Sequence, residues 1–148
     1  MTAAPRPRVL LVDDDAAIRR LVALALEELE VDLVCAADGQ AALAALREAP
    51  ARLVITDLMM PGLSGYALLQ QLADDPALRA GARLAVFSAG LNAQAQERLA
   101  GLPLWQCIQK PVSVMALADI VASALQDDSA EPAAAAPPPA APRGVAAA

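Results

Sequence analysis

The chain has 148 residues, which is the length of about one domain and enough to bury a hydrophobic core. Hydrophobic residues make up 57% of it and aromatic residues only 2%, so we expect an aliphatic core. The formal charge of -6 argues against non-specific binding to nucleic-acid phosphates, because such binding requires clustered Lys and Arg. The absence of His excludes His-bearing zinc sites, Ser-His and Cys-His nucleophile pairs, and a phosphohistidine carried by this chain.

The pattern along the chain indicates one folded domain with a tail at each end. Residues 1–7 are predicted to be an unstructured leader, and the Pro/Ala-rich residues 127–148 a disordered tail. No apolar run approaches the roughly 18 residues that span a bilayer, and acidic residues come too early for a signal peptide. We therefore expect a cytoplasmic protein. Cys35 and Cys107 are too few for a disulfide scaffold and should be reduced.

Between the tails, short apolar runs alternate with longer segments of helical spacing, which predicts five strand-helix pairs. Asp15 and Ser113 are suited to cap the first and last helices, and Gly39 opens the second. Right-handed crossovers then give a doubly wound parallel sheet with helices on both faces. The predicted strands are residues 8–13, 31–35, 52–57, 83–88 and 104–109, of which the first, third and fourth are nearly continuous apolar runs, typical of strands covered on both faces.

Polar residues follow the strands at their carboxyl ends, where such sheets bind their ligands. They are Asp13 to Asp15, Asp57, Ser88 and Lys110. Two like charges about 4 Å apart repel by roughly 4 kcal/mol at an effective dielectric near 20, so clustered carboxylates need a cation or raised pKa values. Lys110 supplies one positive charge, and the all-oxygen set suits Mg²⁺ better than zinc.

Four motifs in this order resemble those of the receiver domain of two-component response regulators. They are VLLVDDD at residues 9–15, ITDLMMPGLSG at 55–65, FSAG at 87–90 and IQKP at 108–111. The resemblance covers residues 8–125, within a predicted receiver domain of residues 8–126. It implies a flavodoxin-like fold with strand order 2-1-3-4-5, and a phosphoacceptor that assists its own phosphoryl transfer rather than an enzyme.

The resemblance also implies a role for each site residue. Asp57 would accept a phosphoryl group from a sensor histidine kinase or a histidine phosphotransfer protein. Asp13, Asp14, Asp57 and the backbone carbonyl of Met59 would hold Mg²⁺. Ser88 and Lys110 would contact the phosphoryl oxygens, and the phosphorylated Asp57, with about two added charges, would draw Ser88 toward it as a switch.

Several details follow from the same motifs. The resemblance implies a cis Lys110–Pro111 bond, and Gly62 and Gly65 would shape the loop beside Asp57 through a positive φ or a close approach. Many receivers have Tyr or Phe where this chain has Cys107, so the usual aromatic switch is absent here. Strand alternation would place Trp105 on the same face as Cys107, where it could replace that aromatic or simply pack.

Met59 and Gly90 flank the expected path of water toward the phosphoryl group, and neither side chain can orient it. We therefore expect slow self-dephosphorylation.

Single features of this sequence also allow other interpretations. Taken singly, the aspartates could cap a helix, Asp57 could start a turn, and Lys110 could be a solvated loop residue. A haloacid-dehalogenase-type phosphatase also uses an Asp nucleophile and Mg²⁺, but residues 13–17 lack its final Thr or Val. A constitutive adaptor is the third option, and nucleotide-binding glycine motifs are absent.

The favoured hypothesis is a stand-alone receiver that changes its affinity for a downstream protein. Its partner surface would be formed by the last two helices and the fifth strand. The strand order also implies that Cys35 and Cys107 lie on opposite edges of the sheet, too far apart for a disulfide. We expect neither nucleic acid nor a membrane as a partner. Oligomeric state stays open, a phosphorylation-dependent dimer being one option.

Overall fold

The computed structural model describes residues 6–126. Residues 1–5 of the predicted leader and the whole predicted tail, 127–148, lie outside this part of the chain. Within it, no helix is long and apolar enough to cross a membrane. The elements in chain order are β1 (Arg8–Val12), α1 (Ala16–Ala25), β2 (Asp32–Ala36), α2 (Gly39–Glu48), β3 (Leu53–Thr56), α3 (Gly65–Asp74), α4 (Pro76–Arg79), β4 (Arg83–Ser88), α5 (Ala93–Leu99), β5 (Leu104–Gln109) and α6 (Val114–Gln126).

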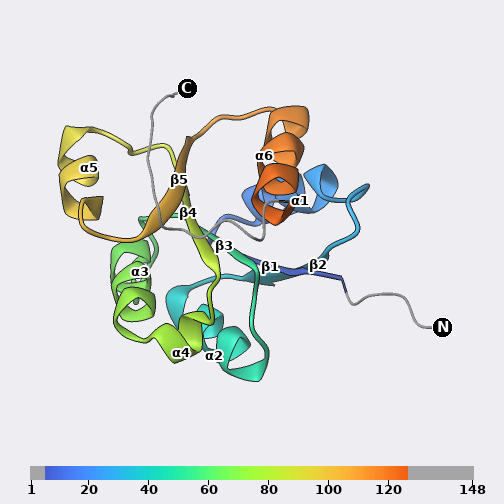
Figure 1. The fold of residues 1–148 in the computed structure, drawn as a ribbon. Helices are drawn as coiled ribbons and strands as arrows, with labels where there is room; N and C mark the ends of the chain where they lie inside the picture. Colours follow the sequence, from blue (N-terminus) through green and yellow to red (C-terminus); the bar gives the residue numbers. More distant parts are fainter. Residues whose placement is uncertain (1–5, 127–148) are drawn as a thin grey trace.

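The five strands form one parallel sheet in the order β2-β1-β3-β4-β5, which confirms the flavodoxin-like prediction. Helices α1 and α6 cover one face, and α2 to α5 lie on the other (Figure 1). The central strands β1, β3 and β4 are almost entirely buried, while the edge strands β2 and β5 keep exposed residues. This agrees with the continuous apolar runs of the central strands.

Alternation along the strands divides the core into two aliphatic layers. Leu10, Val12 and Val54 belong to the layer under α2, α3 and α5. Leu11 and Ile55 belong to the layer under α1 and α6, which also contains Phe87, the only Phe of the chain. Because successive side chains point to opposite faces, each central strand contributes to both layers. The sheet is thereby held rigid, and its carboxyl edge becomes a fixed platform.

The predicted helix starts are confirmed by their caps. Asp15 accepts a 2.8 Å hydrogen bond from the Ala17 N–H at the start of α1, and Ser113 accepts one of 3.0 Å from the Ala116 N–H at the start of α6. Helix α2 begins at Gly39 as predicted, and the Asp38 side chain caps it. Such caps satisfy N–H groups that have no partner within the helix.

The short helix α4 was not predicted. The side chain of Asp75 caps it, and Pro76 stands at its first position, where the missing N–H and the fixed φ of Pro are both favourable. The helix ends at Arg79, and its C-cap Ala80 has a left-handed φ of 54° and is followed by Gly81 at 77°. Its single turn is too short to show a helical period in the sequence.

The prediction that Trp105 and Cys107 share a face is wrong. The pairing of β4 with β5 shifts between Leu84 and Ala85, which pair with Leu104 and Gln106, so Trp105 is an extra residue in a bulge. Trp105 packs in the layer under α6, whereas Cys107 lines a groove beside α5. A bulge inserts one unpaired residue and reverses the alternation beyond it.

The two cysteines lie on opposite edge strands, as the strand order requires. Cys35 is on β2 and Cys107 on β5, and both are free thiols. Three strands separate them, at about 4.8 Å per strand spacing, so the expectation that they cannot form a disulfide holds.

Candidate functional site

The acidic site lies at the carboxyl edge of the sheet, where β1, β3, β4 and β5 end side by side. Asp13 directly follows β1, and its N–H donates to the Ala36 carbonyl of β2. Asp57 directly follows β3, and its N–H donates to the Val12 carbonyl of β1. These backbone bonds extend the sheet ladder by one residue. Both carboxylates are therefore anchored to the rigid platform rather than to a loop.

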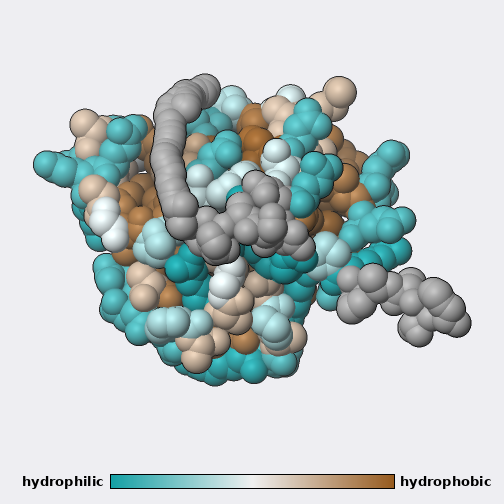
Figure 2. Space-filling view, in the orientation of Figure 1, coloured by the Kyte–Doolittle hydropathy of each residue, from teal (hydrophilic) through white to brown (hydrophobic). Residues whose placement is uncertain are grey.

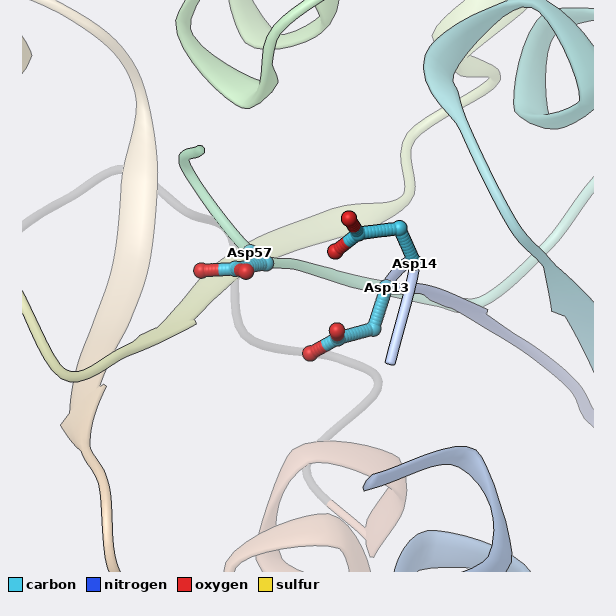
Figure 3. Close-up of side chains that lie close together, drawn as sticks. All are labelled: Asp13, Asp14 and Asp57. Carbon is cyan, nitrogen blue, oxygen red and sulfur yellow. The ribbon is translucent and has the colours of Figure 1, made fainter. Parts of the chain in front are cut away.

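Three carboxylates converge at this edge. Asp13, Asp14 and Asp57 each offer an oxygen, and these oxygens lie within 4.8 Å of one another. Figure 3 shows the Asp13 and Asp14 side chains reaching from the end of β1 toward Asp57 at the end of β3. Asp13 is buried, Asp57 is half-buried and Asp14 is exposed, so the cluster opens to solvent on one side.

Lys110 provides the positive charge of the site. Its Nζ donates a 2.9 Å hydrogen bond to Asp13 Oδ2 and lies 3.7 Å from Asp57 Oδ2. The Lys110 N–H donates to the Ser88 carbonyl at 3.1 Å, and the Lys110–Pro111 peptide bond is cis. Lys110 is the only lysine in the sequence. The Lys110 ammonium group thus faces the carboxylates of Asp13 and Asp57, and the Asp14 carboxylate lies beside these two.

Burial dominates the ionisation of Asp13. Desolvation raises the pKa of its carboxyl above the ordinary value, and the Asp57 charge adds to this. The hydrogen bonds from Lys110 and from the Asp15 N–H act in the opposite direction but do not reverse it. Since burial and a like charge both disfavour the charged form, the site holds excess negative charge that a cation would relieve.

The loop after Asp57 is packed against the Asp57 backbone. The Leu58 N–H donates to Asp57 Oδ1 at 2.8 Å, and the Gly65 N–H donates to the Leu58 carbonyl at 3.0 Å. A Cβ at Gly65 would lie 1.9 Å from the Asp57 carbonyl oxygen, so only Gly fits there. Gly62 has a φ of 76°. The two glycines therefore have the two roles expected from the sequence, a positive φ and a close approach.

Ser88 ends β4 and is buried at 2% exposure. Its Oγ accepts a 3.1 Å hydrogen bond from the Gly90 N–H, which ties it to the loop that leads into α5. A hydroxyl can accept one hydrogen bond and donate another. Ser88 can thus donate to a group in the site while it remains bonded to the loop.

The donor set fits a hard divalent cation. Three carboxylates with one open side match Mg²⁺, which binds through one or two protein carboxylates and keeps several waters. The geometry is thus consistent with the Mg²⁺ site expected of a receiver. Met59, the residue expected to lend its carbonyl, lies in the loop after Asp57, and its side chain is 70% exposed.

The structure brings most of the predicted site residues to one edge and leaves others elsewhere. Asp13, Asp14, Asp57 and Lys110 form one cluster, and Ser88 ends the strand between those of Asp57 and Lys110. Trp105 lies near the amino end of β5, where the Arg83 guanidinium is 5.5 Å from its ring centroid.

Two further residues that the sequence did not indicate support the backbone of the site. The Thr56 hydroxyl donates to the Asp57 carbonyl at 2.8 Å, and the Arg19 guanidinium donates to the Asp13 carbonyl at 2.8 Å.

Comparison with known proteins agrees with this geometry. Residues 9–122 match the family described as the response regulator receiver domain. The chain belongs to this family. Such a domain is a phosphoacceptor signalling module of two-component systems, partnered by histidine kinases, and not a classical enzyme.

Similar proteins include parts of two sensor proteins. The chain is 32% identical over 117 residues to the sensor histidine kinase GacS of Pseudomonas protegens, and 36% identical over 114 residues to the virulence sensor protein BvgS of Bordetella pertussis. These matches cover 78% and 74% of this chain but only 13% and 9% of those proteins. The probable transcriptional regulator ycf27 of Porphyridium aerugineum matches at 40% over 67 residues, which is 28% of its length.

Solved structures agree in fold. A response regulator receiver protein from Pseudomonas putida is 30% identical, with a TM-score of 0.73 and coverage of 82% of this chain and 99% of that one. The chemotaxis protein CheY4 of Vibrio cholerae, at 22% identity and a TM-score of 0.74 over 81% of this chain and 99% of its own, shows the shared fold alone.

Proposed function

We propose that Asp57 accepts a phosphoryl group from a histidine of a sensor kinase or of a histidine phosphotransfer protein, and that the phosphorylated chain changes its affinity for a protein partner. The observation that carries this proposal is the position of Asp57, with Lys110 Nζ 3.7 Å from Oδ2 and the Asp13 and Asp14 oxygens within 4.8 Å. These 148 residues contain no His, so the phosphohistidine donor would lie outside them.

The transfer needs little from the protein beyond alignment and charge. An Asp57 oxygen forms a bond to phosphorus, the P–N bond to the partner's imidazole breaks, and the electron pair stays on that nitrogen, which then takes up a proton. Lys110 offsets charge on the phosphoryl oxygens from a position fixed by Asp13. Asp13, Asp14, Asp57 and the Met59 carbonyl would hold Mg²⁺, which when bound neutralises the same oxygens.

Ser88 would act as the switch in this scheme. It is buried, it ends the strand next to that of Asp57, and it is bonded to the loop before α5. If its hydroxyl donates to a phosphoryl oxygen, movement of Ser88 pulls on Gly90 and so on α5. The phosphorylation signal would leave the site through that loop.

The partner surface we propose is the edge formed by α5, β5 and α6. Figure 2 shows hydrophobic surface beside α5, at the left of the view. A groove of about 330 Å³ lies there, lined by Gln96, Leu99, Leu104 and Cys107 among others. Many receivers have an aromatic residue at the position of Cys107, which lines this groove. The smaller cysteine side chain leaves more space in the groove than an aromatic ring would.

Two sequence expectations stay predictions, namely the cytoplasmic location and the stand-alone role without an attached output domain. The constitutive adaptor is disfavoured because the full set of acceptor, acidic and lysine groups is assembled at one edge.

Intact-mass measurement after incubation with Mg²⁺ and phosphoramidate tests the proposal. We expect wild-type chain to gain the mass of one phosphoryl group and the Asp57→Ala variant to gain none. The Asp32→Ala variant, which removes an exposed aspartate at the start of β2, is the matched control and should gain it. No gain in a folded, Mg²⁺-binding chain would favour the adaptor, and sustained phosphate release from small esters would favour a phosphatase.

The metal expectation has its own test. Mg²⁺ should raise the melting temperature of wild type, because a ligand that binds only the folded state stabilises it. The Asp14→Asn variant should show a much smaller rise, and Asp32→Asn the full rise. An equal response in all three would contradict a site at Asp13, Asp14 and Asp57.

A further inference from the structure

Tyr66 and Arg98 stack on each other across two helices. The Arg98 guanidinium carbon lies 3.6 Å from the centroid of the Tyr66 ring, well within the range of a cation–π contact. Tyr66 is in the first turn of α3 and Arg98 in the last turn of α5. The two helices are neighbours on the same face of the sheet (Figure 1).

The stack bridges a gap rather than adding to a tight helix contact. A groove of about 340 Å³ lies between the two helices, lined by Tyr66, Arg98, Ser64 and Gln70 among others. Both helices bury their apolar faces against the sheet, and they make few direct contacts with each other. The Tyr66–Arg98 stack is therefore a direct side-chain contact between the end of α5 and the start of α3.

On one side, the pair is connected to the phosphoacceptor. Tyr66 directly follows Gly65, which packs against the Asp57 carbonyl with no room for a Cβ and donates to the Leu58 carbonyl at 3.0 Å. The Leu58 N–H in turn donates to Asp57 Oδ1 at 2.8 Å. A shift of the first turn of α3 cannot occur without moving the Asp57 backbone.

On the other side, the pair is connected to Ser88. The Ser88 Oγ accepts from the Gly90 N–H at 3.1 Å, and Asn92, two residues on, caps α5 with a 2.8 Å bond to the Ala95 N–H. Arg98 lies three residues beyond Ala95 on the same short helix. The segment that follows Asp57 and the segment that follows Ser88 thus meet at the contact between Tyr66 and Arg98.

We propose that the Tyr66–Arg98 stack holds α5 against α3 and so couples the position of α5 to the Asp57 loop. This proposal rests on the proposed function and adds to it the residues that carry the coupling. Ser88 Oγ is bonded to the Gly90 N–H, so a Ser88 side chain that moves toward a phosphoryl group on Asp57 would draw the Gly90 loop with it and displace α5 against the stack. The stack would then oppose phosphorylation.

Coupling of this kind is reciprocal. If phosphorylation loosens the stack, then loss of the stack favours phosphorylation by the same factor. An exposed cation–π contact corresponds to about a two- to fivefold effect on an equilibrium. The Arg98→Lys variant keeps the charge and loses the planar stacking group, so it tests the stack without changing the net charge.

The test compares the fraction of chain phosphorylated at limiting phosphoramidate with Mg²⁺, measured by intact mass. We expect Arg98→Lys and Tyr66→Leu each to raise the ratio of phosphorylated to unphosphorylated chain about two- to fivefold. The Tyr66→Phe variant keeps the ring and should match wild type. Arg47→Lys, the same substitution at an exposed arginine in the last turn of α2, is the matched control and should also match wild type.

Two further readouts separate coupling from a merely structural role. In the double variant Tyr66→Leu, Arg98→Lys, the effects should not add, because both changes remove one contact. Tyr66 is the only tyrosine, so ring-labelled tyrosine gives a single NMR signal. Phosphorylation of wild type should move this signal toward its position in unphosphorylated Arg98→Lys.

The outcomes are distinguishable. If wild type takes no phosphoryl group on Asp57, the proposed function fails and the coupling fails with it. If Asp57 is phosphorylated equally in all variants and the Tyr66 signal stays in place, the coupling alone is overturned. Effects of Tyr66→Leu and Arg98→Lys that add fully would likewise overturn it.

Discussion

Lys110 Nζ donates a 2.9 Å hydrogen bond to Asp13 Oδ2, although 97 positions separate the two residues in the chain. The parallel order β1-β3-β4-β5 brings them together, because it places the carboxyl ends of the first and last strands at one edge. The pair keeps the ammonium group 3.7 Å from Asp57 Oδ2. Asp13 therefore positions Lys110 as well as offering a metal ligand.

Replacing Lys110 should impair phosphoryl transfer to Asp57 much more than it impairs folding. We expect Lys110→Met to lower the initial rate of phosphorylation by about 100-fold, the size of effect that loss of one fixed charge-stabilising group has in enzymes. Arg47→Met, which removes an exposed cation from α2, should leave the rate unchanged. The measurement is intact mass against time, with circular dichroism to confirm the fold. A Lys110→Met rate within twofold of wild type would contradict the role given to this residue.

Asp13 should destabilise the fold once it is ionised. Burial raises its pKa in the folded chain, so the folded state holds the proton more tightly than the unfolded state does. Protonated Asp13 therefore favours the folded state below the ordinary carboxyl pKa of about 3.9. This contribution to stability is lost as the pH rises through the raised pKa of the folded chain. Asp13→Asn should therefore be more stable than wild type at pH 7 without Mg²⁺, by on the order of 1 kcal/mol.

Urea unfolding at a series of pH values measures this difference. The gap between Asp13→Asn and wild type should close as the pH falls toward about 4. The Asp32→Asn variant removes a carboxylate on the exposed edge strand β2 and serves as the control. A variant at Asp13 that is no more stable than wild type at pH 7 would show that the Lys110 bond outweighs burial.

Gly65 should not tolerate a side chain. Alanine is normally preferred to glycine in a helix by about 1 kcal/mol, but a Cβ here would lie 1.9 Å from the Asp57 carbonyl oxygen and 2.8 Å from Leu58 Cα. The backbone must shift, so Gly65→Ala should lower the free energy of unfolding by about 1–3 kcal/mol. At Gly90 a Cβ meets only the Ser88 Oγ at 3.9 Å, and Gly90→Ala is the control. Equal stabilities for the two variants would refute the close approach.

The phosphoryl group, once formed, should decay slowly. Met59 and Gly90 lie two positions beyond Asp57 and Ser88, and neither can orient an attacking water. The Met59 side chain is 70% exposed and a Cβ at Gly90 has ordinary space, so Met59→Asn, Gly90→Glu should fold. We expect faster loss of radiolabelled phosphate from this double variant than from wild type. Equal decay rates would count against the hypothesis.

Much of the fold and site could be predicted because the signals are local. Apolar runs of strand length, ended by Asp13, Asp57, Ser88 or Lys110, gave the sheet and its functional edge together. The parallel order then required these ends to meet. The strand boundaries differ by a residue where the ladder ends, as at β3, which was predicted as 52–57 and observed as Leu53–Thr56.

What could not be predicted depends on pairing and packing between distant segments. The bulge at Trp105 is a property of how β5 pairs with β4, and no residue of β5 alone reveals it. The contact of Arg98 with Tyr66 spans two helices, so neither helix period indicates it. Helix α4, by contrast, had a local signal in Asp75 followed by Pro76, a cap and a favoured first residue.

The most direct test of the account is to locate the phosphoryl group by borohydride reduction and tandem mass spectrometry. Reduction converts an aspartyl phosphate to the alcohol, which marks the modified residue permanently. After treatment with Mg²⁺ and phosphoramidate, we predict conversion at Asp57 and at no other aspartate, and none when Mg²⁺ is chelated. Conversion at Asp13 or Asp14 instead, or an unmodified Asp57 in folded, Mg²⁺-loaded protein, would contradict it.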